Sequence, residues 1–232
     1  MKRPFGFRAQ VRAYIRFLEQ KKLARIKALA RYPRRGGILF LGDSLTEEFP
    51  FADLLPEFDI VGRGYSGDTA GMLKERLSYT CAPYAPRAVF LQVGINDLQR
   101  GSSPEETTAA AAEALDAVRA LCPAAKLHLL ALYPVNVTAE KFALIRPRAL
   151  RKPEALEKIA RCNALLSAAA AEREIGFLDL VARLKDERGE LREAYSCDGL
   201  HLTVEGYAAL AEALVPSLVR CGQTEEHTEV LS

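Results

Sequence analysis

The sequence predicts an α/β fold in which one parallel sheet is covered by helices on both faces. Two observations carry this prediction: short apolar segments recur along the chain, and each gap between them contains a segment suited to a helix. Strands that alternate with helices form parallel sheets buried on both sides. The predicted strands are residues 38–41, 58–61, 88–93, 127–132 and 176–180.

Three predicted helices follow these strands. The clearest covers residues 104–121, where Ser103 can cap the first turn, Pro104 suits the first helical position and Glu106 completes a capping box. Another follows Pro153 and runs to about residue 174, and the last covers residues 203–219.

The chain length predicts one folded domain. Its 232 residues, 49% of them hydrophobic, can bury one substantial core. We assign this domain to residues 36–222 and expect the polar residues 223–232 to form a disordered tail.

The N-terminal segment, residues 1–35, is strongly basic. It holds twelve Lys and Arg against one acid, a net +11, so the remainder of this +2 chain carries −9. Its apolar side chains recur on one face of a predicted amphipathic helix: Val11, Ile15, Leu18, Ile26 and Leu29. We expect this face to dock on the acidic body or on a second copy, with a structural and not a catalytic role. The alternative is a tether for nucleic acid or an anionic membrane.

Composition also bears on location and cofactors. The longest apolar runs are too short to span a bilayer, and residues 1–7 lack the apolar stretch of a secretory signal. The chain has five cysteines, an odd number, and none of them forms a C-x-x-C pair. Both features argue against a disulfide framework and a cysteine zinc site. These features predict a soluble, cytoplasmic protein with reduced thiols.

Ser44 is the first candidate for chemistry. It follows the first predicted strand directly, in Gly42-Asp43-Ser44, and the carboxyl ends of strands in open α/β sheets are where ligands bind. Taken alone, the same residues also suit ordinary helix capping.

A nucleophilic serine needs a general base, and histidine is the usual one. The chain has three histidines. His128 falls inside an apolar strand, where a structural position is favoured, and His227 lies in the tail. His201 remains, three residues after Asp198, a carboxylate that could fix its tautomer.

Two further segments could stabilise an oxyanion. Residues 62–69 are rich in glycine and follow the second strand, so Gly67 could direct a backbone N–H toward the site. Asn96 follows the third strand and offers a side-chain amide. Each segment alone also fits another interpretation, a phosphate-type glycine loop or an Asn-Asp turn.

Four blocks in this order resemble the signature of the SGNH hydrolases, also called GDSL esterases or lipases. They are Gly42-Asp43-Ser44-Leu45, Ser66-Gly67-Asp68-Thr69, Gly94-Ile95-Asn96-Asp97 and Asp198-Gly199-Leu200-His201. The resemblance spans about residues 37–220 and is similar to the branch that includes the catalytic subunits of platelet-activating-factor acetylhydrolase. One departure is Gly62, where many relatives carry Asn.

The resemblance implies a three-layer α/β/α sandwich with a five-stranded parallel sheet, which is flavodoxin-like. It also implies the site: Ser44 as nucleophile, His201 as base, Asp198 as its orienting acid, and Ser44, Gly67 and Asn96 as oxyanion donors. The implied activity is hydrolysis of a carboxylic ester through an acyl-enzyme, with no metal or organic cofactor.

The expected substrate is a small-molecule, carbohydrate or lipid ester. No insertion is large enough to build a deep lid, which favours a short acyl group such as acetyl. The long connection 133–152 carries basic residues that could frame the site: Lys141, Arg146, Arg148, Arg151 and Lys152. We expect no nucleic-acid partner and no stable membrane insertion. Assembly into a homo-oligomer is compatible with the sequence.

Two other functions compete with the esterase. A metal-dependent phosphoesterase would use Asp43, Asp97, Asp198 and His201 as ligands, which requires the carboxylates to converge. A catalytically idle binding module would use the basic N-terminal arm as its tether.

Overall fold

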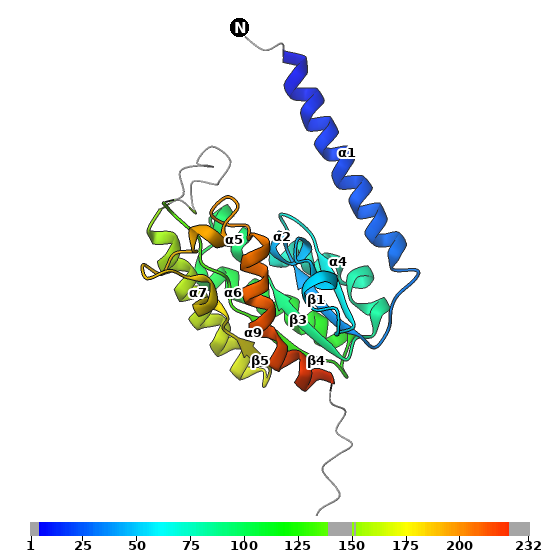
Figure 1. Cartoon of the computed structure of the whole chain (residues 1–232). Coiled ribbons are helices and arrows are strands. Elements are labelled where there is room, and N and C mark those ends of the chain that lie inside the picture. Colours follow the sequence, from blue (N-terminus) through cyan, green and yellow to red (C-terminus); the bar gives the residue numbers. More distant parts are fainter. Residues whose placement is uncertain (1–4, 139–149, 151, 223–232) are drawn as a thin grey trace, which may run out of the picture.

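The computed structural model of the chain describes residues 5–138, 150 and 152–222 (Figure 1). Its centre is a sheet of five strands in the order β2-β1-β3-β4-β5, and every neighbouring pair is parallel. The strands are β1 (Ile38–Gly42), β2 (Ile60–Gly64), β3 (Ala88–Gln92), β4 (Lys126–Leu130) and β5 (Gly176–Leu178). The predicted parallel sheet is therefore confirmed.

Helices cover both faces of the sheet because the side chains of each strand alternate between them. Leu39 and Leu41 pack in one apolar cluster, whereas Ile38 and Phe40 pack in another. The first cluster includes α4 (Ala70–Thr80), α6 (Pro104–Leu121) and α7 (Glu154–Glu172). The second includes α3 (Phe51–Leu54) and α9 (Val204–Gly222), which crosses the front of the sheet in Figure 1. The result is the expected three-layer α/β/α sandwich.

The predicted helices are confirmed at nearly the predicted bounds. α6 begins with the expected capping box: Ser103 Oγ accepts the Glu106 N–H at 3.1 Å, and Glu106 Oε2 accepts the Ser103 N–H at 2.8 Å. The remaining short helices are α2 (Ser44–Glu47), α5 (Ile95–Arg100) and α8 (Val181–Leu184), with 3₁₀ turns at Ala82–Tyr84 and Glu193–Tyr195.

One strand lies later in the chain than predicted. β2 covers Ile60–Gly64 instead of residues 58–61, so glycines interpreted as loop belong to the strand. The reason is tertiary packing, because a Cβ on Gly64 would lie 2.3 Å from the Glu47 backbone nitrogen of α2. A side chain on Gly62 would crowd Phe51 at 3.0 Å, so the Asn that many relatives carry does not fit here without movement of that ring.

The N-terminal helix α1 (Phe5–Leu29) projects from the body instead of lying on it (Figure 1). Its 25 residues extend for about 37 Å. Four of the five predicted docking side chains, Val11, Ile15, Leu18 and Leu29, are 38–48% exposed. The expectation that they pack on the chain's own body is therefore wrong. The second half of α1 contacts the body, in part through polar groups: Lys22 pairs with Glu47, and the Glu19 carbonyl accepts the Tyr65 hydroxyl.

Two further features concern the described residues only. No helix among them is both long enough and apolar enough to cross a membrane. The five cysteines are free thiols, and all but Cys197 are buried.

Candidate active site

Three of the predicted segments lie side by side at the carboxyl edge of the sheet. Gly42 at the end of β1 is in register with Gly64 on one neighbouring strand and with Gln92 on the other. The residues that follow these three positions therefore leave the sheet at one level. They are Ser44, the glycine loop, which we define as residues 65–69, and the segment that contains Asn96.

Ser44 begins helix α2 immediately after the sheet. Asp43 caps this helix by accepting the Leu45 N–H at 3.0 Å. The tight turn requires glycine at position 42, because a Cβ there would lie 2.1 Å from Thr46 Oγ1 and 2.6 Å from the Gln92 carbonyl oxygen. The local sequence thus fixes Ser44 at the end of the strand, and the residue is 7% exposed.

The structure brings Ser44, His201 and Asp198 together in a chain of hydrogen bonds. Ser44 Oγ lies 2.9 Å from His201 Nε2, and His201 Nδ1 lies 2.7 Å from Asp198 Oδ2. The second carboxylate oxygen, Asp198 Oδ1, accepts the backbone N–H groups of Leu200 at 2.9 Å and His201 at 2.8 Å. The carboxylate is therefore fixed by its own turn while it orients the imidazole.

The electrostatics of this pair suit a general base. The hydrogen bond to Asp198 raises the pKa of His201 above its usual 6.5, although burial opposes the shift. Partial burial raises the pKa of Asp198, but the bonds from the His201 ring and the backbone amides outweigh it and lower that pKa to about 2. Asp198 is therefore ionised wherever His201 titrates.

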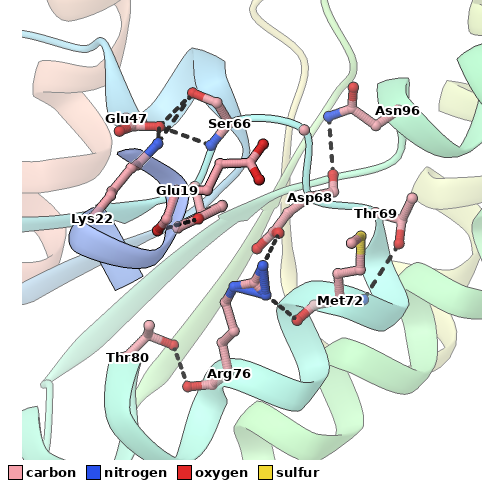
Figure 2. Close-up of polar contacts among 12 residues, drawn as sticks. Glu19, Lys22, Glu47, Ser66, Asp68, Thr69, Met72, Arg76, Thr80 and Asn96 are labelled. Atoms are coloured by element: carbon pink, nitrogen blue, oxygen red, sulfur yellow. Dashed lines mark hydrogen bonds and ion pairs between the residues drawn. The ribbon is translucent and has the colours of Figure 1, made fainter. Parts of the chain in front are cut away.

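Asn96 and the glycine loop contact each other directly. Asn96 Nδ2 donates to the Asp68 carbonyl oxygen at 3.0 Å, as Figure 2 shows. Gly67 has φ +81°, a left-handed conformation that favours glycine, and the position of its missing Cβ has no heavy atom within 4 Å. The loop thus turns at Gly67 next to open space.

Glu47 is a residue near the site that the sequence did not reveal. Its carboxylate accepts the Ser66 N–H at 2.8 Å and the Ser66 hydroxyl, which joins α2 to the glycine loop (Figure 2). A glutamate in the first turn of a helix is ordinary N-terminal chemistry. No pattern in the sequence distinguishes it from such a residue.

The carboxylates that a metal site would need face different partners. Asp97 Oδ2 accepts the Ala70 N–H at 3.1 Å, and Asp43 bonds the backbone of α2. Within residues 5–138, 150 and 152–222, no three His, Cys, Asp or Glu side chains are grouped as metal ligands. Burial raises the pKa of Asp43 to about 7 and that of Asp68 to about 6.

Two of the other candidate residues, His128 and Lys152, lie among the residues that the structure describes. His128 occupies β4, stacks on Phe90 at 4.6 Å and contacts Cys221, so its structural role is confirmed. Burial lowers its pKa. Lys152 is exposed. The remaining positions lie outside the described residues: Lys141, Arg146, Arg148, Arg151, His227 and the tail 223–232.

Comparison with known proteins decides the family. Residues 40–209 match the model of the GDSL-like lipase/acylhydrolase family, and this match contains all four sequence blocks. The chain belongs to this family. It is accordingly an ester hydrolase, and the idle binding module is set aside. No curated protein matches the chain in sequence.

Solved structures place the GDSL fold across most of the chain. A Streptococcus pneumoniae protein, provisionally described as a platelet activating factor, is 27% identical, with a TM-score of 0.80 over 93% of this chain and 100% of that one. A GDSL-like lipase from Bacteroides thetaiotaomicron is 22% identical, with a TM-score of 0.71 over 87% and 97%. A variant acetyl-xylooligosaccharide esterase from Geobacillus stearothermophilus is 19% identical, with a TM-score of 0.59 over 80% and 96%.

Proposed function

We propose that this GDSL hydrolase cleaves its ester in two steps through an acyl-enzyme on Ser44. The observation that carries the proposal is the relay from Ser44 Oγ to His201 Nε2 at 2.9 Å and from His201 Nδ1 to Asp198 Oδ2 at 2.7 Å. In this arrangement His201 accepts the serine proton as Oγ attacks the ester carbonyl. Asp198 holds the ring with its proton on Nδ1 and compensates the charge of the imidazolium.

The tetrahedral intermediate needs donors for its oxyanion. We assign these donors to the backbone N–H groups of Ser44 and Gly67 and to Nδ2 of Asn96. The register of β2, β1 and β3 supports this assignment, because their adjacent carboxyl ends carry the three donors. The bond from Asn96 to the Asp68 carbonyl supports it further, since it sets the amide against the glycine loop.

In the first step the C–O bond of the tetrahedral intermediate breaks, and His201 returns its proton to the departing alcohol. Water then attacks the acyl-enzyme, His201 accepts a proton from that water, and collapse of the second intermediate releases the acid and regenerates Ser44. The cycle consumes one ester and one water and leaves the enzyme unchanged.

The acyl group is proposed to be short, such as acetyl. Three connections at the catalytic edge support this: Asp43 alone separates β1 from α2, the glycine loop leads directly into α4, and α5 begins at Ile95 just after β3. Connections of this length cannot cover a long acyl chain. The alcohol part of the substrate stays unassigned.

The test is hydrolysis of p-nitrophenyl esters from acetate to octanoate by the purified protein and by Ser44→Ala. The proposal expects the highest kcat/KM for acetate and a loss of about 10⁶-fold in the variant. Retained activity in a folded Ser44→Ala would contradict the nucleophile, whereas a maximum at octanoate would contradict only the acyl preference.

A further inference from the structure

The glycine loop is held by charged side chains that reach it from several elements. The Gly67 carbonyl accepts Arg100 Nη2 at 2.9 Å, and Asp68 Oδ1 pairs with Arg76 Nη2 of α4 at 3.0 Å. This last pair is nearly inaccessible, with Asp68 3% exposed and Arg76 15% exposed. On its α4 side the loop is therefore held by an ion pair that is largely shielded from water (Figure 2).

The opposite side of the loop is held by α1, the helix that projects from the body. Lys22 Nζ forms an ion pair with Glu47, lies 3.4 Å from Ser66 Oγ and sits 4.2 Å from the centre of the Tyr65 ring. The Tyr65 hydroxyl donates to the Glu19 carbonyl of the same helix at 3.1 Å. Figure 2 shows Lys22 between Glu47 and Ser66, with Glu19 of the same helix beside them.

Glu47 transmits the contact toward the site. Its helix begins at Ser44, and its carboxylate accepts both the backbone N–H and the hydroxyl of Ser66. Ser66 and Gly67 share one peptide plane, and that plane carries the Gly67 N–H. Fixing Ser66 at two atoms therefore restricts the direction in which the Gly67 N–H points.

We propose that Lys22 is a positioning residue for the oxyanion donor at Gly67, acting through Glu47 and Ser66. The inference rests on the proposed role of Gly67. Lys22 lies outside residues 40–209, the segment that matches the GDSL-like family. The N-terminal helix, which we expected to be structural only, is thereby part of the apparatus that sets the rate.

The expected size of the effect follows from two limits. Complete removal of an oxyanion donor lowers kcat about 10²- to 10³-fold, but Lys22 only holds a donor in place. The Lys22 and Glu47 side chains are 30% and 28% exposed, and an ion pair of this kind contributes up to about 1 kcal/mol, equivalent to about fivefold. We therefore expect Lys22→Met to lower kcat by about two- to fivefold.

The experiment measures kcat and KM on p-nitrophenyl acetate for Lys22→Met, Lys22→Arg and Lys27→Met. Lys27 is the matched control, because it also lies on α1 and packs over an α4 ring, Tyr79, at 5.2 Å. The proposal expects lower kcat with little change of KM in Lys22→Met, substantial recovery in Lys22→Arg, and wild-type kinetics in Lys27→Met. Circular dichroism and thermal unfolding confirm that each variant is folded.

Two further measurements separate positioning from general loss of structure. If Lys22 acts through Glu47, the double variant Lys22→Met/Glu47→Gln should lose less kcat than the product of the two single-variant losses. Raising NaCl to about 1 M should lower the wild-type kcat toward that of Lys22→Met and leave the variant unchanged, since salt screens this exposed pair.

The inference is overturned if an active wild type and Lys22→Met share one kcat, if only KM changes, or if Lys27→Met loses as much. The inference is also overturned if salt lowers kcat equally in wild type and in Lys22→Met. The same holds if the losses of kcat from Lys22→Met and Glu47→Gln simply multiply in the double variant. The proposed function fails separately, through an inactive wild type or an active Ser44→Ala.

Discussion

Replacement of Asp198 by Asn tests the proposed relay more finely than removal of the nucleophile. The carboxylate makes three bonds: Oδ2 contacts His201 Nδ1 at 2.7 Å, while Oδ1 accepts the backbone N–H groups of Leu200 and His201 at 2.9 and 2.8 Å. An Asn that keeps both backbone bonds must place its oxygen at Oδ1 and its NH₂ against Nδ1. The imidazole proton then moves to Nε2, which can no longer accept the Ser44 proton.

The residual activity of Asp198→Asn comes from the other orientation of the introduced amide, in which its oxygen faces His201 Nδ1. This orientation restores the His201 tautomer with its proton on Nδ1 but leaves the backbone N–H groups of Leu200 and His201 facing an NH₂ group. At about 1–2 kcal/mol for each partly buried donor, the turned form is about 30- to 1,000-fold less populated. It also lacks the charge that stabilises the imidazolium. We therefore expect kcat to fall about 10³-fold, with a smaller change of KM.

The assay is the pH dependence of p-nitrophenyl acetate hydrolysis by wild type, Asp198→Asn and Asp116→Asn. Asp116 is a control carboxylate that pairs with Arg173 at 2.9 Å on the outer helices. Because Asp198 raises the pKa of His201, the acidic limb of the remaining activity should move to lower pH in Asp198→Asn. If Asp198→Asn keeps kcat within threefold of wild type and the acidic limb of its pH profile does not move, Asp198 is not the orienting acid.

Three other outcomes are expected. Asn96→Ala should lower kcat about 10²- to 10³-fold with a smaller effect on KM, because the hydrogen bond from the Asn96 side-chain amide to the oxyanion strengthens in the transition state. A change confined to KM would assign Asn96 to substrate binding. The wild-type kcat/KM should rise with pH through a value above 6.5, where His201 loses its proton, and a limb at or below 6.5 would contradict the raised pKa. Asp43→Asn keeps an acceptor for the Leu45 N–H and removes a carboxylate whose pKa burial raises from 3.8 to about 7. Between these two pH values Asp43 ionises in the unfolded chain but not in the folded one, which lowers the stability of the wild type as pH rises. The thermal stability of Asp43→Asn relative to wild type should therefore increase from about pH 4 to about pH 7. A difference in melting temperature that stays constant over this range would contradict the raised pKa.

The sheet and its helices could be predicted because their signals are local. The buried strands are apolar runs, and Ser103 with Glu106 defines the start of α6 without help from the rest of the fold. The strand β2 was placed too early because its glycines have a cause outside the strand. Gly64 is needed by the approach of α2, which no local pattern reveals.

The relay was predictable from a process of elimination among three histidines and from the four ordered blocks. The support around the glycine loop was not. Lys22, Glu47 and Arg76 come from three helices, and each resembles an ordinary exposed charge in the sequence. The amphipathic pattern of α1 also gives a wrong prediction, because four of the five side chains on its apolar face stay exposed, whereas Lys22 and Glu19 contact the glycine loop.

The role of Ser44 as the nucleophile is tested by the site at which a serine-directed fluorophosphonate attaches. We expect a single adduct on Ser44, identified by peptide mass, with activity lost in proportion to labelling and with no adduct on Ser44→Ala. Labelling should be slow in Asn96→Ala, because the reagent's oxygen needs the same donors as the ester. An active enzyme that stays unlabelled, or an adduct on another residue with Ser44 intact, would contradict Ser44 as the nucleophile.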